Sequence, residues 1–361
     1  MIIVRSRTIR IAILNDTHCG IRNSNEIFLE NAATFYREVF FPYCKDNGIT
    51  QIIHLGDYYD NRKQISIKAL HHNRKNFLEP MRDMGMHMDI FPGNHDVFYK
   101  NTNEVNSLKE VLGHFMNEIN IIMDPKVLEY GNSKIAMLPW MNSQNYKKSL
   151  EFVKNCSADI LCGHLELEGF ELMRGVTNKH GMSADIFSKF EMVLTGHFHT
   201  RSQKDNVTYL GSQMEFFWSD AHDPKYFYVL DTETRELEKV LNPHTLFEKV
   251  MYNDVDIDYT DFNVDHFDNK FVKVVVVEKK DPFMFDKFIE KIQTRSVHEL
   301  KIAENFSEFL GENVDDEDVS VEDTSELLDS YIDAVDTELD KDRIKKDMRS
   351  LLTQAQAMEI V

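Results

Sequence analysis

The sequence predicts an α/β fold in which two mixed β-sheets pack face to face between layers of helices. Two observations lead to this prediction. In the first part of the 361-residue chain, apolar runs typical of strands buried on both faces alternate with helical segments. Later runs follow one another through short connections, as antiparallel strands do. This order predicts a sandwich of two mixed sheets between helices.

Strand–helix units fill the first third of the chain. Apolar runs that end in polar clusters predict strands in "RIAILND", "TQIIHLGD" and "HMDIFPGNHD". Helical spacing predicts helices over residues 25–46, within "ISIKALHHNRKNFLEPMRDMG" and over 104–119. The first of these helices has one broad apolar face, which comprises Ile27, Phe28, Phe35, Val39 and Phe40.

The next segments complete a first domain that we expect to span residues 1–250. Strands are predicted in "SKIAMLPW", "ADILCGHLEL", "FEMVLTGHFH" and "VTYLGS", with helices near 143–155 and at 183–190. The last segment, "YFYVLDTETRELEKVL", predicts a hairpin whose turn lies at "DTETR".

Three further segments follow the first domain. A strand in "FVKVVVVEKK" and a helix in "DPFMFDKFIEKIQT" predict a small α+β unit over 251–310. Residues 311–323 read as an acidic linker of low hydrophobicity. Residues 324–361 predict a helical tail with apolar faces, because apolar residues recur at three- and four-residue spacing. The first of these faces comprises Leu327, Leu328, Tyr331, Ile332, Val335 and Leu339, and the second Ile344, Met348, Leu351, Leu352 and Ala355.

The net charge of −20 argues against a nucleic-acid partner at first sight. The charge is uneven, however. Residues 311–361 hold 16 acids and 5 bases, a net of −11, whereas the other 310 residues hold 45 acids and 36 bases, a net of −9. A metal site would also collect carboxylates for its own reasons. The charge therefore leaves DNA binding open.

Other broad features predict a reduced, cytoplasmic protein without a membrane partner. No run of 18 apolar residues occurs, and the N-terminus lacks a signal-peptide pattern. The four cysteines show neither a CxxC motif nor the spacing of a disulfide framework.

Acidic, amide and imidazole side chains follow the predicted strands at the points where the strands end. Because ligands bind beyond the carboxyl ends of strands in α/β sheets, we expect these side chains to converge. Each motif alone also fits a capped turn or a polar loop, but five such motifs in series favour a metal site. The expected ligands are Asp16, His18, Asp57, Asn94, His164, His197 and His199.

This ligand set indicates the kind of metal. It contains no thiolate, so a structural zinc site is not expected. Mixed oxygen and nitrogen ligands favour Mn²⁺, with Mg²⁺, Fe²⁺ or Zn²⁺ as alternatives. Seven ligands exceed what one ion needs, whereas two divalent ions bridged by a carboxylate would use all of them.

The series of motifs resembles the calcineurin-like metallophosphoesterase superfamily. Within it, "GDYYDNRKQIS", "GNHDVFYKN", "LPWM", "CGHLELEGF" and "GHFHT" are most similar to nuclease subunits of the SbcCD type, in particular those of T-even phages. The resemblance implies the metallophosphoesterase sandwich, with residues 251–310 as a capping unit that positions DNA.

The resemblance also implies a role for each site residue. Asp16, His18 and His199 would hold the first ion, and Asn94, His164 and His197 the second. Asp57 would bridge both ions. His95 would protonate the leaving 3′ oxygen or stabilise the pentavalent phosphorane, with Asp96 orienting its ring. One position departs from the pattern: cellular relatives often carry a histidine where this chain has Asp60, which also fits a simple turn residue.

The expected function is a two-metal DNA nuclease, exo- or endonucleolytic, that forms the catalytic subunit of a recombination and repair complex. The resemblance implies an SMC-like coiled-coil ATPase as partner, bound through the C-terminal helices, and a homodimer within the complex; a phage-encoded chain would act in the host cytoplasm. A phosphatase or small-molecule phosphodiesterase remains an alternative, and so does a scaffold subunit with a vestigial site.

Overall fold

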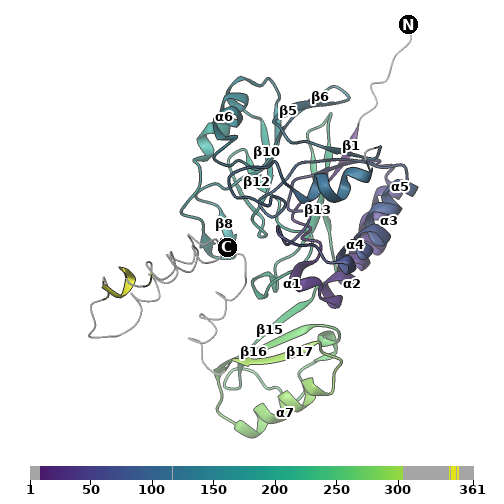
Figure 1. Cartoon of the computed structure of the whole chain (residues 1–361). Coiled ribbons are helices and arrows are strands. Elements are labelled where there is room, and N and C mark those ends of the chain that lie inside the picture. The colour runs from purple at the N-terminus through teal and green to yellow at the C-terminus, as the bar shows by residue number, and fades with distance from the viewer. Residues whose placement is uncertain (1–8, 116, 304–340, 342, 347, 349–361) are drawn as a thin grey trace.

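Two six-stranded sheets form the centre of the molecule (Figure 1). The computed structural model describes residues 9–115, 117–303, 341, 343–346 and 348. The predicted linker over 311–323 lies outside the described residues, as does nearly all of the predicted tail over 324–361. The few described positions of the tail are helical.

The first sheet has the strand order β14-β13-β1-β2-β3-β4. The four strands that come first in the chain, β1 to β4, are parallel to one another. The last two strands, β13 and β14, form a hairpin, and β13 pairs antiparallel with β1. The strands are β1 (Arg10–Leu14), β2 (Gln51–His54), β3 (His87–Ile90), β4 (Ile119–Ile121), β13 (Tyr226–Asp231) and β14 (Leu237–Leu241).

The second sheet has the order β11-β12-β10-β7-β6-β5. Its four inner strands are parallel, and both edge strands are antiparallel to their neighbours. The strands are β5 (Lys126–Tyr130), β6 (Ser133–Leu138), β7 (Ile160–His164), β10 (Met192–Gly196), β11 (Ser202–Lys204) and β12 (Val207–Tyr209). The predicted sandwich of two mixed sheets is therefore confirmed.

Apolar side chains on both faces of the strands hold the layers together. In β1, Ile11 and Ile13 lie in the core between the two sheets, whereas Ala12 and Leu14 pack against helices. This alternation explains why the strand reads as a continuous apolar run. Since the inter-sheet core also includes residues of β2, β6, β7 and β10, both sheets contribute strands that are buried on two faces.

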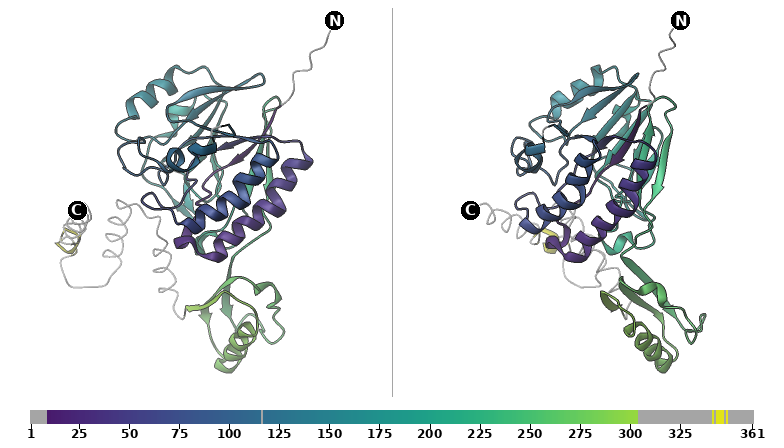
Figure 2. Two further views of the ribbon diagram at one scale, coloured as in Figure 1. Left: turned by 45° about the vertical axis from the view of Figure 1, so that its right-hand side comes forward. Right: turned by 90° about the vertical axis from the view of Figure 1, so that its right-hand side faces the viewer.

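Two long helices run side by side along the outer face of the first sheet (Figure 2). Each is α-helical at both ends with a π-helical turn between, so the predicted helices over 25–46 and after Ile65 are confirmed. A side chain caps the N-terminus of each helix: Asn25 accepts the Ile27 N–H, and Ser66 accepts the Ala69 N–H. The segments are α2 (Glu26–Phe35), η1 (Tyr36–Phe40) and α3 (Phe41–Asp46), then α4 (Ile67–Asn73), η2 (Arg74–Leu78) and α5 (Glu79–Asp83).

The outer face of the second sheet packs against α6 (Tyr146–Asn155) and a 3₁₀ turn at Ala184–Phe187. The helix predicted over 104–119 is mostly wrong. That segment holds only a π turn at Leu108–Leu112 and a 3₁₀ turn at Gly113–Phe115, because the chain must then enter β4 at Ile119.

A smaller three-stranded parallel sheet follows the sandwich and lies below it in Figure 1. It consists of β15 (Phe247–Asn253), β16 (Phe271–Glu278) and β17 (Glu299–Ala303), with α7 (Pro282–Gln293) on one face. Rings join this unit to the sandwich: Phe28 of α2 lies 6.0 Å from Phe247 and 5.7 Å from Phe271 between centroids. Among the described residues, no helix is long and apolar enough to cross a membrane.

Candidate metal centre

The carboxyl ends of β1, β2 and β3 in the first sheet meet those of β7 and β10 in the second. Parallel pairing places these ends at one edge within each sheet. The residues that follow the strands form three groups whose possible ligand atoms lie within 4.8 Å of one another. The groups are Asp16, His18 and His199; Asp57, His164 and His197; and His18, Asp60 and His95.

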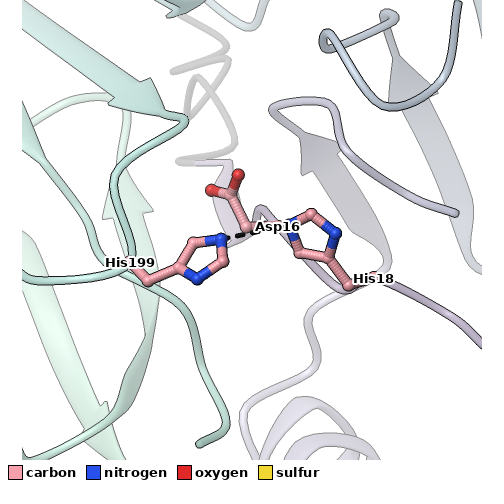
Figure 3. A group of neighbouring side chains, drawn as sticks. All are labelled: Asp16, His18 and His199. Carbon is pink, nitrogen blue, oxygen red and sulfur yellow. Dashed lines mark hydrogen bonds between the residues drawn. The ribbon is translucent and has the colours of Figure 1, made fainter. Parts of the chain in front are cut away.

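The first group joins the end of β1 to the segment after β10 (Figure 3). The Nε2 atoms of His18 and His199 lie 3.0 Å apart, so two atoms that can both bind a metal face each other. Both carboxylate oxygens of Asp16 lie 3.1 Å from the His197 backbone N–H, which donates to them. Asp16 therefore also fixes the strand end that carries His197 and His199.

The Asn94 side chain lies against both histidines of the second group. Its Oδ1 lies 3.0 Å from Nε2 of His164 and 3.0 Å from Nδ1 of His197. The other ring nitrogen of His164, Nδ1, lies 2.8 Å from the Leu55 carbonyl and donates to it. That bond fixes the tautomer in the neutral ring and leaves Nε2 as the atom available to a metal.

Asp57 belongs to the second group and also faces the first. Its Oδ1 accepts the His95 backbone N–H at 2.8 Å. Its Oδ2 lies 3.2 Å from Nε2 of His164 and 3.9 Å from Nε2 of His18. One carboxylate oxygen thus faces a histidine of each group, which is the position that a bridging ligand requires.

Backbone strain accompanies these contacts. Asp16, His18, Asp57 and His197 all adopt the left-handed region, with φ of 46°, 41°, 54° and 95°. Such conformations cost about 1–3 kcal/mol each in residues other than glycine and persist where the surroundings enforce them, often at functional sites. The hydrogen bonds to Asp16 and Asp57 described above supply part of that enforcement.

Two glycines of the motifs allow this close packing. A Cβ atom on Gly93 would lie 2.1 Å from Oδ1 of Asp57, and one on Gly196 would lie 2.7 Å from Oδ2 of Asp16. The glycines of "GNHD" and "GHFH" are therefore required because carboxylates of the site occupy the space that any side chain would need.

The charge state of the second group follows from burial and close pairing. Burial acts to lower the pKa of His164, but Asp57 and the Leu55 carbonyl raise it to about 9. Burial also acts to raise the pKa of Asp57, yet His164 and His95 hold it well below its usual range. Burial and the neighbouring His164 lower the pKa of His197 to about 3. A metal must therefore displace a proton from His164.

His95 lies beside the first group, with its ring centroid 4.8 Å from that of His18. Its Nδ1 lies 2.7 Å from the main-chain carbonyl of Asp60. The carboxylate of Asp96 instead accepts backbone N–H groups of Tyr58, Tyr59 and Gly93. The expectation that Asp96 orients the His95 ring is therefore corrected, because the Asp60 carbonyl contacts the ring nitrogen. Asp96 instead joins the turn after β2, which carries Tyr58 and Tyr59, to the turn after β3, which carries Gly93.

The Asp60 side chain also faces the site. Its Oδ1 lies 3.4 Å from Nδ1 of His18, the ring nitrogen opposite the one that meets His199. A carboxylate at this place can orient a histidine ligand. The sequence left Asp60 undecided between a turn residue and a site residue, and the structure places its side chain against a predicted ligand.

Sequence reasoning missed several residues that shape the site. Gln213 accepts the Asn15 N–H at 3.3 Å and donates to the Asp16 carbonyl at 3.3 Å. The ring of Phe217 stacks on His199, with centroids 5.7 Å apart and planes inclined by 6°. Trp140 packs on His197 at 5.4 Å. For the two aromatic residues the sequence offered the family motif "LPWM" and the apolar run "MEFFW", and neither distinguishes a site wall from core. No motif pointed to Gln213.

The donor set fits hard or borderline divalent ions. The groups offer carboxylate oxygens and imidazole nitrogens, Asn94 adds an amide oxygen, and no thiolate belongs to any group. Four members of the groups are almost completely buried: Asp16, His18, Asp57 and His164 are each at most 1% exposed. The other members, Asp60, His95, His197 and His199, are half-buried. So many titratable groups in one buried cluster are typical of a metal centre.

Comparison with known proteins identifies the family. The model of the calcineurin-like phosphoesterase family matches residues 9–201, which include every predicted ligand. Exonuclease subunit 1 of Enterobacteria phage T4 is 32% identical over 336 residues, which cover 92% of this chain and 95% of that protein. The solved structure of an archaeal phosphodiesterase is 18% identical and covers 65% of this chain and 100% of its own, with a TM-score of 0.35, which is too low to support a conclusion. From the family match and the phage relative, we conclude that the chain belongs to the calcineurin-like phosphoesterases.

Proposed function

We propose that this protein is a two-metal-dependent DNA nuclease that hydrolyses phosphodiester bonds. The observation that carries the proposal is the position of Asp57, whose Oδ2 faces His164 of one group and His18 of the other. The similarity to a phage exonuclease subunit over nearly the whole chain supports DNA as the substrate.

The proposed ligands divide between two ions. Asp16, His18 and His199 would hold the first, Asn94, His164 and His197 the second, and Asp57 would bridge them. When bound, two divalent ions supply positive charge at a phosphate and lower the pKa of a water molecule that they share. The donor set favours Mn²⁺, and Mg²⁺ is the alternative.

His95 would act as the general acid for the leaving 3′ oxygen. The Asp60 carbonyl accepts a hydrogen bond from Nδ1, so the proton that the ring exchanges is the one on Nε2. General acid catalysis of this kind is typically worth about 10²–10⁴-fold in rate. Asp96 has a positioning role, because its carboxylate holds the backbone of the turns that carry Asp57 and His95.

Cleavage assays test the substrate class. Purified protein with Mn²⁺ or Mg²⁺ is incubated with single-stranded, duplex and hairpin DNA, and in parallel with p-nitrophenyl phosphate esters. We expect DNA cleavage that a matched preparation of Asp57→Asn lacks, which excludes a contaminating nuclease. Faster turnover of the small esters than of every DNA substrate would instead support the phosphatase or small-molecule phosphodiesterase alternative.

The proposed partners are DNA and an SMC-like coiled-coil ATPase, with a homodimer of this chain in the complex. The name of the phage relative, a subunit, supports a multi-subunit assembly. Residues 251–310 would form the unit that positions DNA, and residues 324–361 the docking helices. The acidic linker before this tail and its apolar stripes support an intermolecular role.

Two substitutions in the full chain test the docking role. Leu328→Asp with Ile332→Asp should abolish co-purification with the ATPase and leave cleavage of simple DNA unchanged. Asp329→Asn with Asp333→Asn, on the other side of the predicted helix, is the control and should retain binding. Unchanged binding by the first pair would show that the tail is not the docking element. Light scattering on the purified chain, of 42.3 kDa, tests the dimer.

A further inference from the structure

A buried lysine lies behind the first group of ligands. Lys225 is only 4% exposed, and its Nζ donates to Oδ1 of Asp220 at 2.7 Å and to Oδ2 of Asp223 at 2.9 Å. Its third bond goes to the main-chain carbonyl of His199, also at 2.9 Å. All three N–H groups of the ammonium therefore have acceptors, and one of these bonds holds the backbone of a proposed metal ligand.

Asp220, the partner of Lys225, also supports His199 through the two phenylalanines that pack on its ring. The other carboxylate oxygen of Asp220 accepts the backbone N–H groups of Phe216 and Phe217 at 2.8 and 2.9 Å. The Phe217 ring stacks on His199, and the Phe216 ring lies 5.6 Å from both His18 and His199. The pair thus fixes His199 through its backbone and through the two rings that pack on it.

Stability alone does not explain a charged pair in this place. Apolar side chains of similar volume often stabilise a core as well as a buried ion pair does, because removing two charges from water is costly. Neighbouring carboxylates hold Lys225 charged: burial acts to lower its pKa, but Asp220 and Asp223 raise it above its ordinary value. A fixed cation, unlike an apolar side chain, can donate a directed hydrogen bond to the His199 carbonyl and so hold the backbone of a ligand.

We propose that Lys225, held by Asp220, is a positioning residue that sets the orientation of His199 and so the affinity of the first metal site. This inference rests on the proposed function. The second group makes none of these contacts with Lys225 or Asp220, so its affinity should not depend on them. Groups that orient metal ligands from behind typically change metal affinity by about 10–100-fold when they are removed.

The test is calorimetric titration of the full chain with Mn²⁺, together with thermal unfolding of each variant. Lys225→Met removes the cation and leaves the buried Asp220 carboxylate without its partner, so this variant should also be less stable. The double variant with Asp220→Asn removes the unpaired charge and keeps an oxygen for the Phe216 and Phe217 N–H groups. His199→Ala identifies the binding step of the first site, and Lys148→Met, in an exposed pair with Asp124, is the control.

We expect the double variant to recover thermal stability relative to Lys225→Met and still to bind Mn²⁺ at least about 10-fold more weakly at the His199 step only. Lys148→Met should match the wild type. Unchanged affinity in the double variant, or equal weakening of both steps in proportion to lost stability, would overturn the inference. If the wild-type chain bound no Mn²⁺, the proposal of a metal site would be wrong, and the positioning role of Lys225 would be wrong for that reason.

Discussion

The buried Glu215 side chain should make the free energy of unfolding depend on pH, and a single substitution should remove its contribution. Its side chain is 1% exposed, and its Oε2 accepts the backbone N–H groups of Leu246 and Phe247 where the small sheet begins. Burial raises the pKa of Glu215 from 4.5 to about 7, although these two N–H groups act to lower it. The folded chain therefore binds a proton that the unfolded chain releases between these pH values.

The direction of the effect follows from this raised pKa. The contribution of Glu215 to the free energy of unfolding is fully present below pH 4.5 and is lost as the pH rises through 7. Since each pKa unit corresponds to about 1.4 kcal/mol, the loss amounts to about 3 kcal/mol. Glu215→Gln keeps an oxygen that accepts both N–H groups but cannot ionise, so it should not show this loss.

Urea unfolding at pH 5 and pH 8 measures the effect. The stability of Glu215→Gln relative to the wild type should increase by about 2–3 kcal/mol between the two pH values. Other titrating groups cancel in this difference. Glu151→Gln, at an exposed position on α6, is the control and should follow the wild type at both pH values. Parallel pH profiles for Glu215→Gln and the wild type would refute the reasoning.

Two further predictions concern the site. His95→Ala should bind both ions and slow DNA cleavage by about 10²–10⁴-fold in single-turnover assays, because it removes only the proton donor; loss of an ion in a Mn²⁺ titration would show that His95 is itself a ligand. Gly93→Ala should abolish most Mn²⁺ binding, because its Cβ would lie 2.1 Å from Oδ1 of Asp57. Gly113→Ala is its control, since that Cβ meets nothing within 4 Å, and intact binding by Gly93→Ala would contradict the packing described for Asp57.

The sequence predicts strands well where they are buried on both faces. β1, β2, β7 and β10 read as apolar runs because each meets the inter-sheet core on one side and helices on the other. The edge strands β5 and β11 were missed, since a short strand buried on at most one face does not stand out from a polar loop. β15 and β17, the edge strands of the small sheet, were not predicted either, because polar residues interrupt their apolar positions.

The site shows a similar division. The side chains that the structure brings together could be named from the sequence, because each follows a strand and parallel strands end at one edge. The contact between the Asp60 carbonyl and His95 could not, since every residue has a carbonyl and only the folded turn selects one. Lys225 and Glu215 were equally hidden, because the sequence does not reveal which charged residues tertiary packing will bury.

The bridging position of Asp57 is the central claim, and calorimetric titration of the wild type and Asp57→Asn with Mn²⁺ tests it most directly. We predict two ions per wild-type chain. In Asp57→Asn, we predict loss of most metal binding with the fold retained, as judged by circular dichroism, because one carboxylate oxygen faces histidines of both groups. Two sites of unchanged affinity in a folded Asp57→Asn variant would contradict the account.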